Sequence, residues 1–80
     1  MAEIQSGERE LGRAVILRAI EDASAPKDSF DRREARLFLC AKNELWARSL
    51  RFWCYIAGWE EDDVISYARK RWERNEHYLN

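Results

Sequence analysis

Residues that interrupt helices are scarce in this chain. Its 80 residues include one proline and three glycines, whereas charged residues make up 36%. Proline and glycine are the residues that helix interiors tolerate least, because proline lacks a backbone donor and glycine is conformationally free. A chain so poor in breakers and rich in Arg, Glu, Ala and Leu is predicted to be helical. We expect one all-α domain, residues 1–80, of three to four short helices.

Length and charge exclude several classes of function. Eighty residues are too few for a complete dinucleotide-binding sheet or a (β/α)8 barrel. No apolar run approaches the roughly 18 residues of a membrane span, and the first residues lack the pattern of a signal peptide. The 14 basic and 15 acidic residues leave a net charge of -1, which gives no general attraction for nucleic acid. We therefore expect a cytoplasmic protein without membrane contact.

The residue types needed for catalysis or metal binding do not combine in the sequence. The spacing of Cys40 and Cys54 matches no zinc pattern, and His77 is the single histidine. There is no Ser-His-Asp set, glycine-rich phosphate loop or pair of carboxylates at catalytic spacing. Both cysteines lie in apolar runs, so we expect buried, reduced thiols. The sequence predicts a protein that is not an enzyme and has no metal or cofactor.

The first predicted helix spans residues 6–23. Its predicted core row, with apolar residues every four positions, consists of Leu11, Val15 and Ala19. Ile16 and Ile20 widen this row on one side. So broad an apolar arc predicts contact with two neighbouring helices. Pro26 disfavours helix at the residue before it, so residues 24–29 are predicted to form a loop.

A capping box predicts the start of a second helix over residues 31–42. Asp31 would cap it and Glu34 would reach back to the cap, with Phe30 as the preceding apolar residue. The positions expected on its buried side are Ala35, Phe38 and Leu39. The positions expected on its solvent side are Arg32, Arg33 and Arg36.

The third predicted helix has the cleanest periodicity in the chain. Asn43 is its predicted N-cap, and Gly58 stands where a left-handed C-terminal cap is needed. The expected core row consists of Trp46, Leu50, Trp53 and Ala57, and the row beside it of Leu45, Ser49, Phe52 and Ile56. Leu50 and Trp53 form the centre of this row, so we expect them at the centre of the core.

Four consecutive acids, residues 60–63, are predicted to open a fourth helix. Negative charge is favourable in the first turn because the helix dipole is positive there. The apolar side of this helix is expected to carry Val64, Ile65, Ala68 and Trp72. Its basic residues gather toward the C-terminal half and are Arg69, Lys70, Arg71 and Arg74.

The last two predicted helices resemble a helix-turn-helix unit. That unit requires a small residue, a glycine at the turn and a later apolar residue, and these are Cys54, Gly58 and Val64. The resemblance implies a DNA-binding transcriptional regulator as the alternative function. Arg69, Lys70, Arg71 and Arg74 would then contact the DNA backbone. The acids of residues 60–63 would face phosphate, however, and would repel it.

A second resemblance concerns residues 36–71. The segment FWCYIAGW of residues 52–59, followed by acids and then Val64, is similar to small uncharacterised phage and prophage proteins. In those proteins an acidic residue and a proline usually open the last helix, where this chain has Glu60 and Glu61. The resemblance implies a helical phage-type protein in the host-cell cytoplasm and implies no catalytic residue.

The aromatic supply exceeds what one small core usually holds. The chain has four Trp, three Tyr and three Phe, and those expected at the surface are Tyr55, Trp59, Tyr67, Trp72 and Tyr78. Exposed aromatic residues are typical of protein–protein hot spots, and small domains gain stability by association, with a second copy or another protein. The predicted partner-binding residues are Tyr55, Trp59, Glu60, Glu61, Asp62, Asp63 and Tyr67. We expect a non-catalytic regulator or inhibitor of a host system, such as a host defence complex, whose partner has a basic surface.

Overall fold

Four helices make up the part of the chain that the structure describes. The structure, a computed structural model, describes the backbone of residues 6–79 and the side chains of residues 6–74. No strand occurs within residues 6–79, so the all-α prediction is confirmed. Expectations for His77 and Tyr78 concern side chains outside the described ones. The helices are α1 (Ser6–Ala23), α2 (Phe30–Leu39), α3 (Glu44–Ala57) and α4 (Glu61–Leu79).

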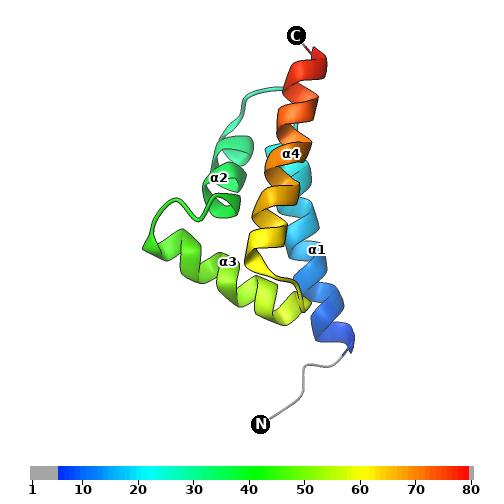
Figure 1. The fold of residues 1–80 in the computed structure, drawn as a ribbon, viewed down its shortest axis with the longest axis vertical. Helices are drawn as coiled ribbons and strands as arrows, with labels where there is room; N and C mark the ends of the chain where they lie inside the picture. The colour runs from blue at the N-terminus through cyan, green and yellow to red at the C-terminus, as the bar shows by residue number, and fades with distance from the viewer. Residues whose placement is uncertain (1–5, 80) are drawn as a thin grey trace.

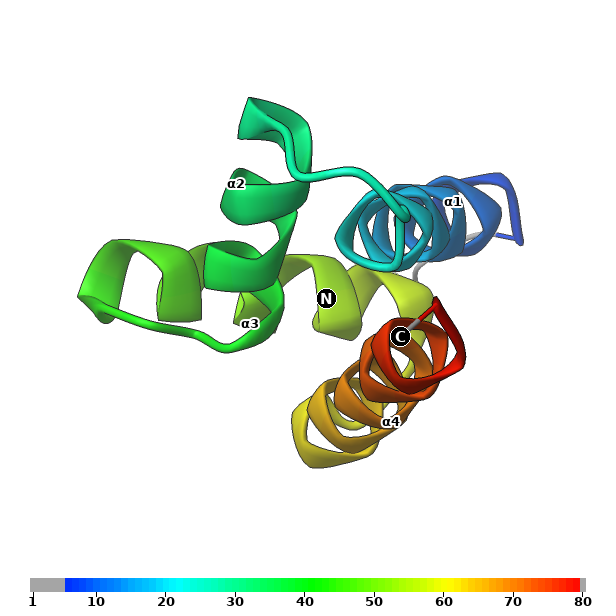
Figure 2. The same cartoon turned by 90° about the horizontal axis from the view of Figure 1, so that it is seen from above.

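The first and last helices lie side by side and run in the same direction (Figures 1 and 2). Between them in the chain, α2 runs back the opposite way and α3 crosses below (Figure 1). α1 packs against all three other helices, one more than the two neighbours that its broad apolar arc predicts. None of the described helices is long and apolar enough to cross a membrane.

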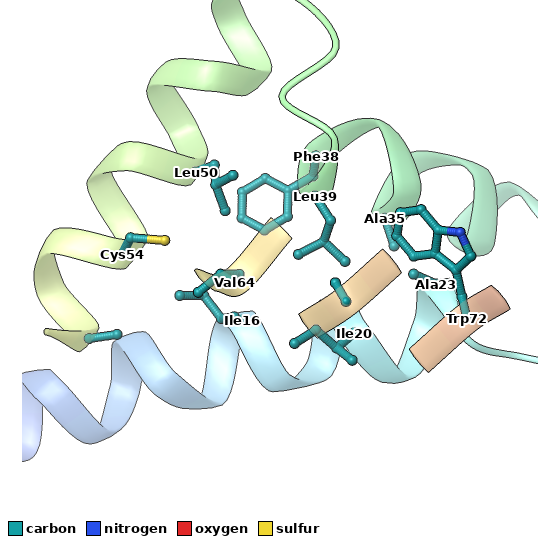
Figure 3. Close-up of a cluster of buried hydrophobic side chains, with 12 residues drawn as sticks. Ile16, Ile20, Ala23, Ala35, Phe38, Leu39, Leu50, Cys54, Val64 and Trp72 are labelled. Atoms are coloured by element: carbon teal, nitrogen blue, oxygen red, sulfur yellow. The ribbon is translucent and has the colours of Figure 1, made fainter. Parts of the chain in front are cut away.

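The core lies where all four helices face one another (Figure 3). α1 supplies two isoleucines, α2 supplies Phe38 and Leu39, α3 supplies Leu50 with smaller side chains, and α4 closes the cluster from one side. Burial of this apolar surface is the main favourable term in folding. The buried apolar residues are Ile16, Ile20, Ala23, Ala35, Phe38, Leu39, Leu50, Cys54, Ala57, Val64, Ala68 and Trp72.

The buried side of α1 differs from the predicted row. Its buried residues are Gly12, Ile16, Ile20 and Ala23. Of the predicted row, Ile16 and Ile20 are buried as expected, but Val15 and Ala19 are only half-buried and Leu11 is exposed. The reason is a close helix crossing, because a Cβ on Gly12 would lie 2.7 Å from Ile56 Cγ2 and 2.8 Å from the backbone nitrogen of Ala57. Glycine lets α3 approach at this point, and the crossing turns Leu11 toward solvent.

The predicted ends of α2 were wrong. Ser29, not Asp31, is the N-cap, and its Oγ accepts a hydrogen bond of 3.0 Å from the Arg32 backbone nitrogen. The helix then stops at Leu39, because Ala41 adopts a left-handed backbone with φ of 48°. A serine in an extended backbone conformation satisfies the first amide groups as well as the predicted aspartate would. Ala35, Phe38 and Leu39 are buried, as predicted.

The arginines of α2 are not all on the solvent side. Arg33 is exposed, as predicted. Arg36, however, reaches inward and donates from Nε to the Ala23 carbonyl at 2.9 Å, with its guanidinium 5.2 Å from the ring centre of Trp72. Arg32 donates similarly to the Ala25 carbonyl, at 3.2 Å. This packing explains why Trp72, predicted to reach the surface, is buried.

Both predicted caps of α3 are confirmed. Asn43 Oδ1 accepts from the Trp46 backbone nitrogen at 3.1 Å, and Gly58 is left-handed with φ of 74°. Leu50 is fully buried as expected, but Cys54 takes the central place that Trp53 was predicted to occupy. The two tryptophans of the predicted row are only half-buried, because α3 faces the core through Leu50, Cys54 and Ala57. In α4, the predicted apolar side is buried except for the half-buried Ile65.

Candidate protein-binding groove

A surface groove of about 460 Å³ separates α1 from the first half of α4. α1 and α4 lie side by side and run in the same direction (Figure 1), and residues from both helices and from the α3–α4 turn line the groove. Its lining residues are Leu17, Ile20, Gly58, Trp59, Glu60, Asp63, Val64 and Tyr67. We refer to these eight residues as the α1–α4 groove.

The floor of the α1–α4 groove is apolar. Ile20 and Val64 are buried at its base. Leu17 on α1 and Tyr67 on α4 line it from opposite helices and are 45% and 54% exposed. A hollow with apolar walls and a few polar groups is typical of a site that receives an apolar side chain. Tyrosine is also among the residues that contribute most binding energy at protein interfaces.

The turn between α3 and α4 holds one wall of the groove in place. Gly58 allows the chain to reverse, and the Trp59 backbone nitrogen then donates to the Cys54 carbonyl at 3.0 Å. This is the bond pattern of a Schellman cap. Arg13 adds a contact from α1, with its guanidinium 5.3 Å from the Trp59 ring centre and its Nε donating to the Ala57 carbonyl at 3.0 Å. Trp59 is thus positioned from two helices.

The four consecutive acids point in different directions. Glu60 and Asp63 line the groove and are exposed. Glu61 instead pairs with Arg51 of α3 at 3.6 Å. Asp62 lines a separate, shallow hollow on the other side of α4. Successive helical residues lie about 100° apart around the axis, so four consecutive acids cannot all face one site.

The predicted partner-binding residues are therefore only partly brought together. The structure places Trp59, Glu60, Asp63 and Tyr67 in the groove, and leaves Tyr55, Glu61 and Asp62 outside it. Tyr55 is exposed on α3, as predicted. Sequence reasoning missed Leu17, although a leucine outside the predicted core row of its helix was a usable signal. It also missed Arg13, for which the sequence offered no signal because its contacts are distant along the chain.

The basic residues of the alternative function lie along the second half of α4. Arg69, Lys70, Arg71 and Arg74 are all exposed. Arg69 and Lys70 border the same shallow hollow as Asp62, and an acid at that place opposes phosphate binding. Arg69 also lies 3.9 Å from Cys40 Sγ.

The two cysteines are free thiols in different surroundings. Cys54 is buried as predicted, whereas Cys40 is only half-buried. Burial raises the pKa of the Cys54 thiol to about 11, and the charges of Glu61 and Glu60 add to this effect. Such a thiol stays protonated and unreactive near neutral pH. Within the described residues, no group of three or more His, Cys, Asp or Glu is placed to hold a metal ion.

Comparisons with known proteins add no relative. No protein-family model matches the chain, and no curated protein or solved structure was found to be similar to it. The resemblance of residues 36–71 to phage and prophage proteins therefore stays a prediction.

Proposed function

We propose that this protein is a non-catalytic binding protein that captures a protein partner in the α1–α4 groove. The observation that carries the proposal is the pairing of an apolar floor with an acidic rim. Among the described residues, neither Glu60 nor Asp63 has an ion-pair partner. A partner segment with an apolar side chain flanked by Lys or Arg would fill the floor and neutralise the rim.

The chemistry of the groove favours a regulator or an inhibitor. A basic surface with apolar side chains is typical of proteins that bind nucleic acid. Occupation of such a surface by the acidic rim would exclude the polyanion that normally binds there. Together with the resemblance to phage proteins, this supports a phage-type protein that acts on a host system.

Two matched pairs of residues allow a sharp test. Asp62 and Asp63 are adjacent acids, but only Asp63 lines the groove; Tyr55 and Tyr67 are both exposed, but only Tyr67 lines it. A photoreactive amino acid placed at position 17 should cross-link the partner in host-cell lysate, whereas one at the exposed Arg48 of α3 should not. Mass spectrometry then identifies the partner.

Affinities measured with that partner decide the proposal. Asp63→Ala and Tyr67→Ala should each raise the dissociation constant about tenfold or more, since groove contacts and rim charges are lost. Asp62→Ala and Tyr55→Ala should leave it within about twofold. Equal effects within each pair would contradict the groove. Tight, salt-sensitive binding to duplex DNA, lost when Arg69, Lys70 and Arg71 become alanine, would establish the DNA-binding regulator instead.

A further inference from the structure

A second apolar surface lies across α1, α2 and α3, and α4 contributes no residue to it. It consists of two hollows, of about 280 and 370 Å³, which adjoin because both are lined by Glu34 and Trp46. We name this surface the aromatic trough. The half-buried Trp46 and Trp53 form its floor beside Val15 and Ala19 of α1.

The trough exists because the apolar side of α3 is wider than the core requires. The core uses Leu50, and the apolar residues continue around the helix in one direction, through Trp46 and Trp53 to Leu45 and Phe52. Two ring contacts fix the floor. Trp46 lies edge-on to Phe38 of α2 with ring centres 6.3 Å apart, and Trp53 lies edge-on to Phe52 at 5.1 Å. The floor is thus a rigid aromatic surface.

Large apolar side chains project beside these hollows. Phe30, at the first turn of α2, lines one hollow and is 71% exposed. Leu45 lines neither hollow, but it precedes Trp46 of the trough in the first turn of α3 and is 73% exposed. Leu37 is exposed too and lines the same hollow as Phe30. Monomeric soluble proteins rarely leave so many large apolar side chains together in contact with water. The surface therefore has both projections and the hollows that could receive them.

Charges of both signs border the trough. Arg18 and Arg33 lie beside Asp31 and Glu34. Arg18 pairs at 3.4 Å with Asp22, a half-buried acid that lines the same hollow, and Arg33 pairs with the exposed Asp28 at 3.6 Å. Pairs at the surface contribute little stability. Among the described residues, no ion pair holds Asp31 or Glu34. A partner of one charge sign would leave the groups of its own sign unmatched, whereas a second copy of this chain can match both signs.

We propose that the aromatic trough is the interface of a two-fold symmetric dimer of this chain. In a two-fold interface the same residues face each other from both copies. Arg33 of each copy then meets Glu34 of the other, and Phe30 of each copy enters the hollow that Leu37 and Trp46 line. The groove on the other flank of α1 stays open, so this proposal does not depend on the proposed function.

Analytical ultracentrifugation of the full chain tests the dimer. We expect the wild type to sediment with twice its monomer mass at concentrations of about 10–100 µM, a range typical of small interfaces. Phe30→Glu and Leu45→Glu should each raise the dimer dissociation constant at least about tenfold. Both positions are exposed in a first helical turn, where glutamate is favourable, so the helical circular dichroism should be unchanged. Leu17→Glu, in the α1–α4 groove, is the matched control and should leave the dimer intact.

A charge exchange separates a two-fold interface from general stickiness. Arg33→Glu and Glu34→Arg should each weaken the homodimer, because like charges then face each other across the axis. Mixing the two variants should restore a dimer that contains one copy of each, since one copy carries two acids and the other two arginines at this place. A wild type that stays monomeric up to about 200 µM would overturn the proposal. A dimer that survives Phe30→Glu and Leu45→Glu, or that is lost only with Leu17→Glu, would also overturn it.

Discussion

Gly12 is the residue at which α1 comes closest to α3. A methyl group there would lie within 3 Å of both a side-chain atom of Ile56 and the backbone nitrogen of Ala57. The backbone of α3 cannot move aside as a flexible side chain would. The close approach of α1 and α3 therefore requires glycine at position 12, although alanine would be the better helix former there.

We expect Gly12→Ala to lower the free energy of unfolding by about 1–3 kcal/mol, because overpacking outweighs the gain in helix propensity. Gly7→Ala is the control, since no atom lies within 4 Å of the added methyl group. This control should change stability little or raise it by up to about 1 kcal/mol. Urea denaturation of the two variants measures both effects. Equal stability of the two variants would show that the helices do not cross at Gly12.

Cys54 and Cys40 should differ in reactivity. At pH 8 a maleimide should modify the half-buried Cys40 first and leave Cys54 protected until the protein is unfolded in urea.

The raised pKa of Cys54, from 9.0 to about 11, also has a consequence for the pH dependence of stability. Below pH 9 the thiol is protonated in both the folded and the unfolded state, so the stability that it contributes is fully present. This stability is lost as the pH rises through 11, because the unfolded chain ionises at the lower pH. Wild type should thus lose about 2 kcal/mol more than Cys54→Ala between pH 8 and 10.5. Labelling of both cysteines at one rate in the native protein would contradict the burial of Cys54.

At the scale of elements, α3 shows which parts of a helix the sequence can predict. Its two ends follow from local chemistry, because Asn43 and Gly58 satisfy backbone groups within a few residues. Its buried side depends on where three other helices lie, and the apolar arc is wide enough to allow several orientations. Leu50 is central in all of them, whereas Trp53 is central only in the orientation that the sequence suggested.

This difference predicts the result of two substitutions. Leu50→Ala should cost about 2–5 kcal/mol, which approaches the whole stability of so small a domain. Trp53→Ala should cost less, although it removes more atoms, because Trp53 is already partly exposed to solvent whereas Leu50 is fully buried. Thermal or urea unfolding at low protein concentration, below the range in which the dimer forms, gives the comparison. A larger loss for Trp53→Ala would mean that α3 faces the core through its tryptophan side.

The fold class and the sequence positions of the helices were predictable because both depend on local periodicity, capping residues and breakers. The details that were wrong are tertiary. Leu11 was predicted inside because a glycine was not recognised as a contact, and Trp72 was predicted outside because its arginine neighbour lies on another helix. The site was predicted in part for the same reason. Four acids that adjoin in sequence suggested one surface, whereas the helix distributes them over three.

At the scale of the whole molecule, α1 separates two surfaces of different chemistry. One flank borders the α1–α4 groove through Leu17, and the other borders the aromatic trough through Val15 and Arg18. The groove has an acidic rim and the trough has charges of both signs, so the two surfaces select different partners. A dimer joined through its troughs would present two grooves to the same partner, which raises apparent affinity without any new contact.

The side-by-side position of the first and last helices (Figure 1) also determines when the protein can fold during its synthesis. Ile16 and Ile20 of α1 belong to one buried cluster with Val64, Ala68 and Trp72 of α4. The ribosome supplies the α1 residues well before those of α4. Until α4 has left the exit tunnel, one side of α1 has no partner, so the nascent chain carries exposed apolar surface until then. Contacts between such distant segments also slow folding relative to helical proteins with only local contacts. The core is therefore completed only after α4 has been made.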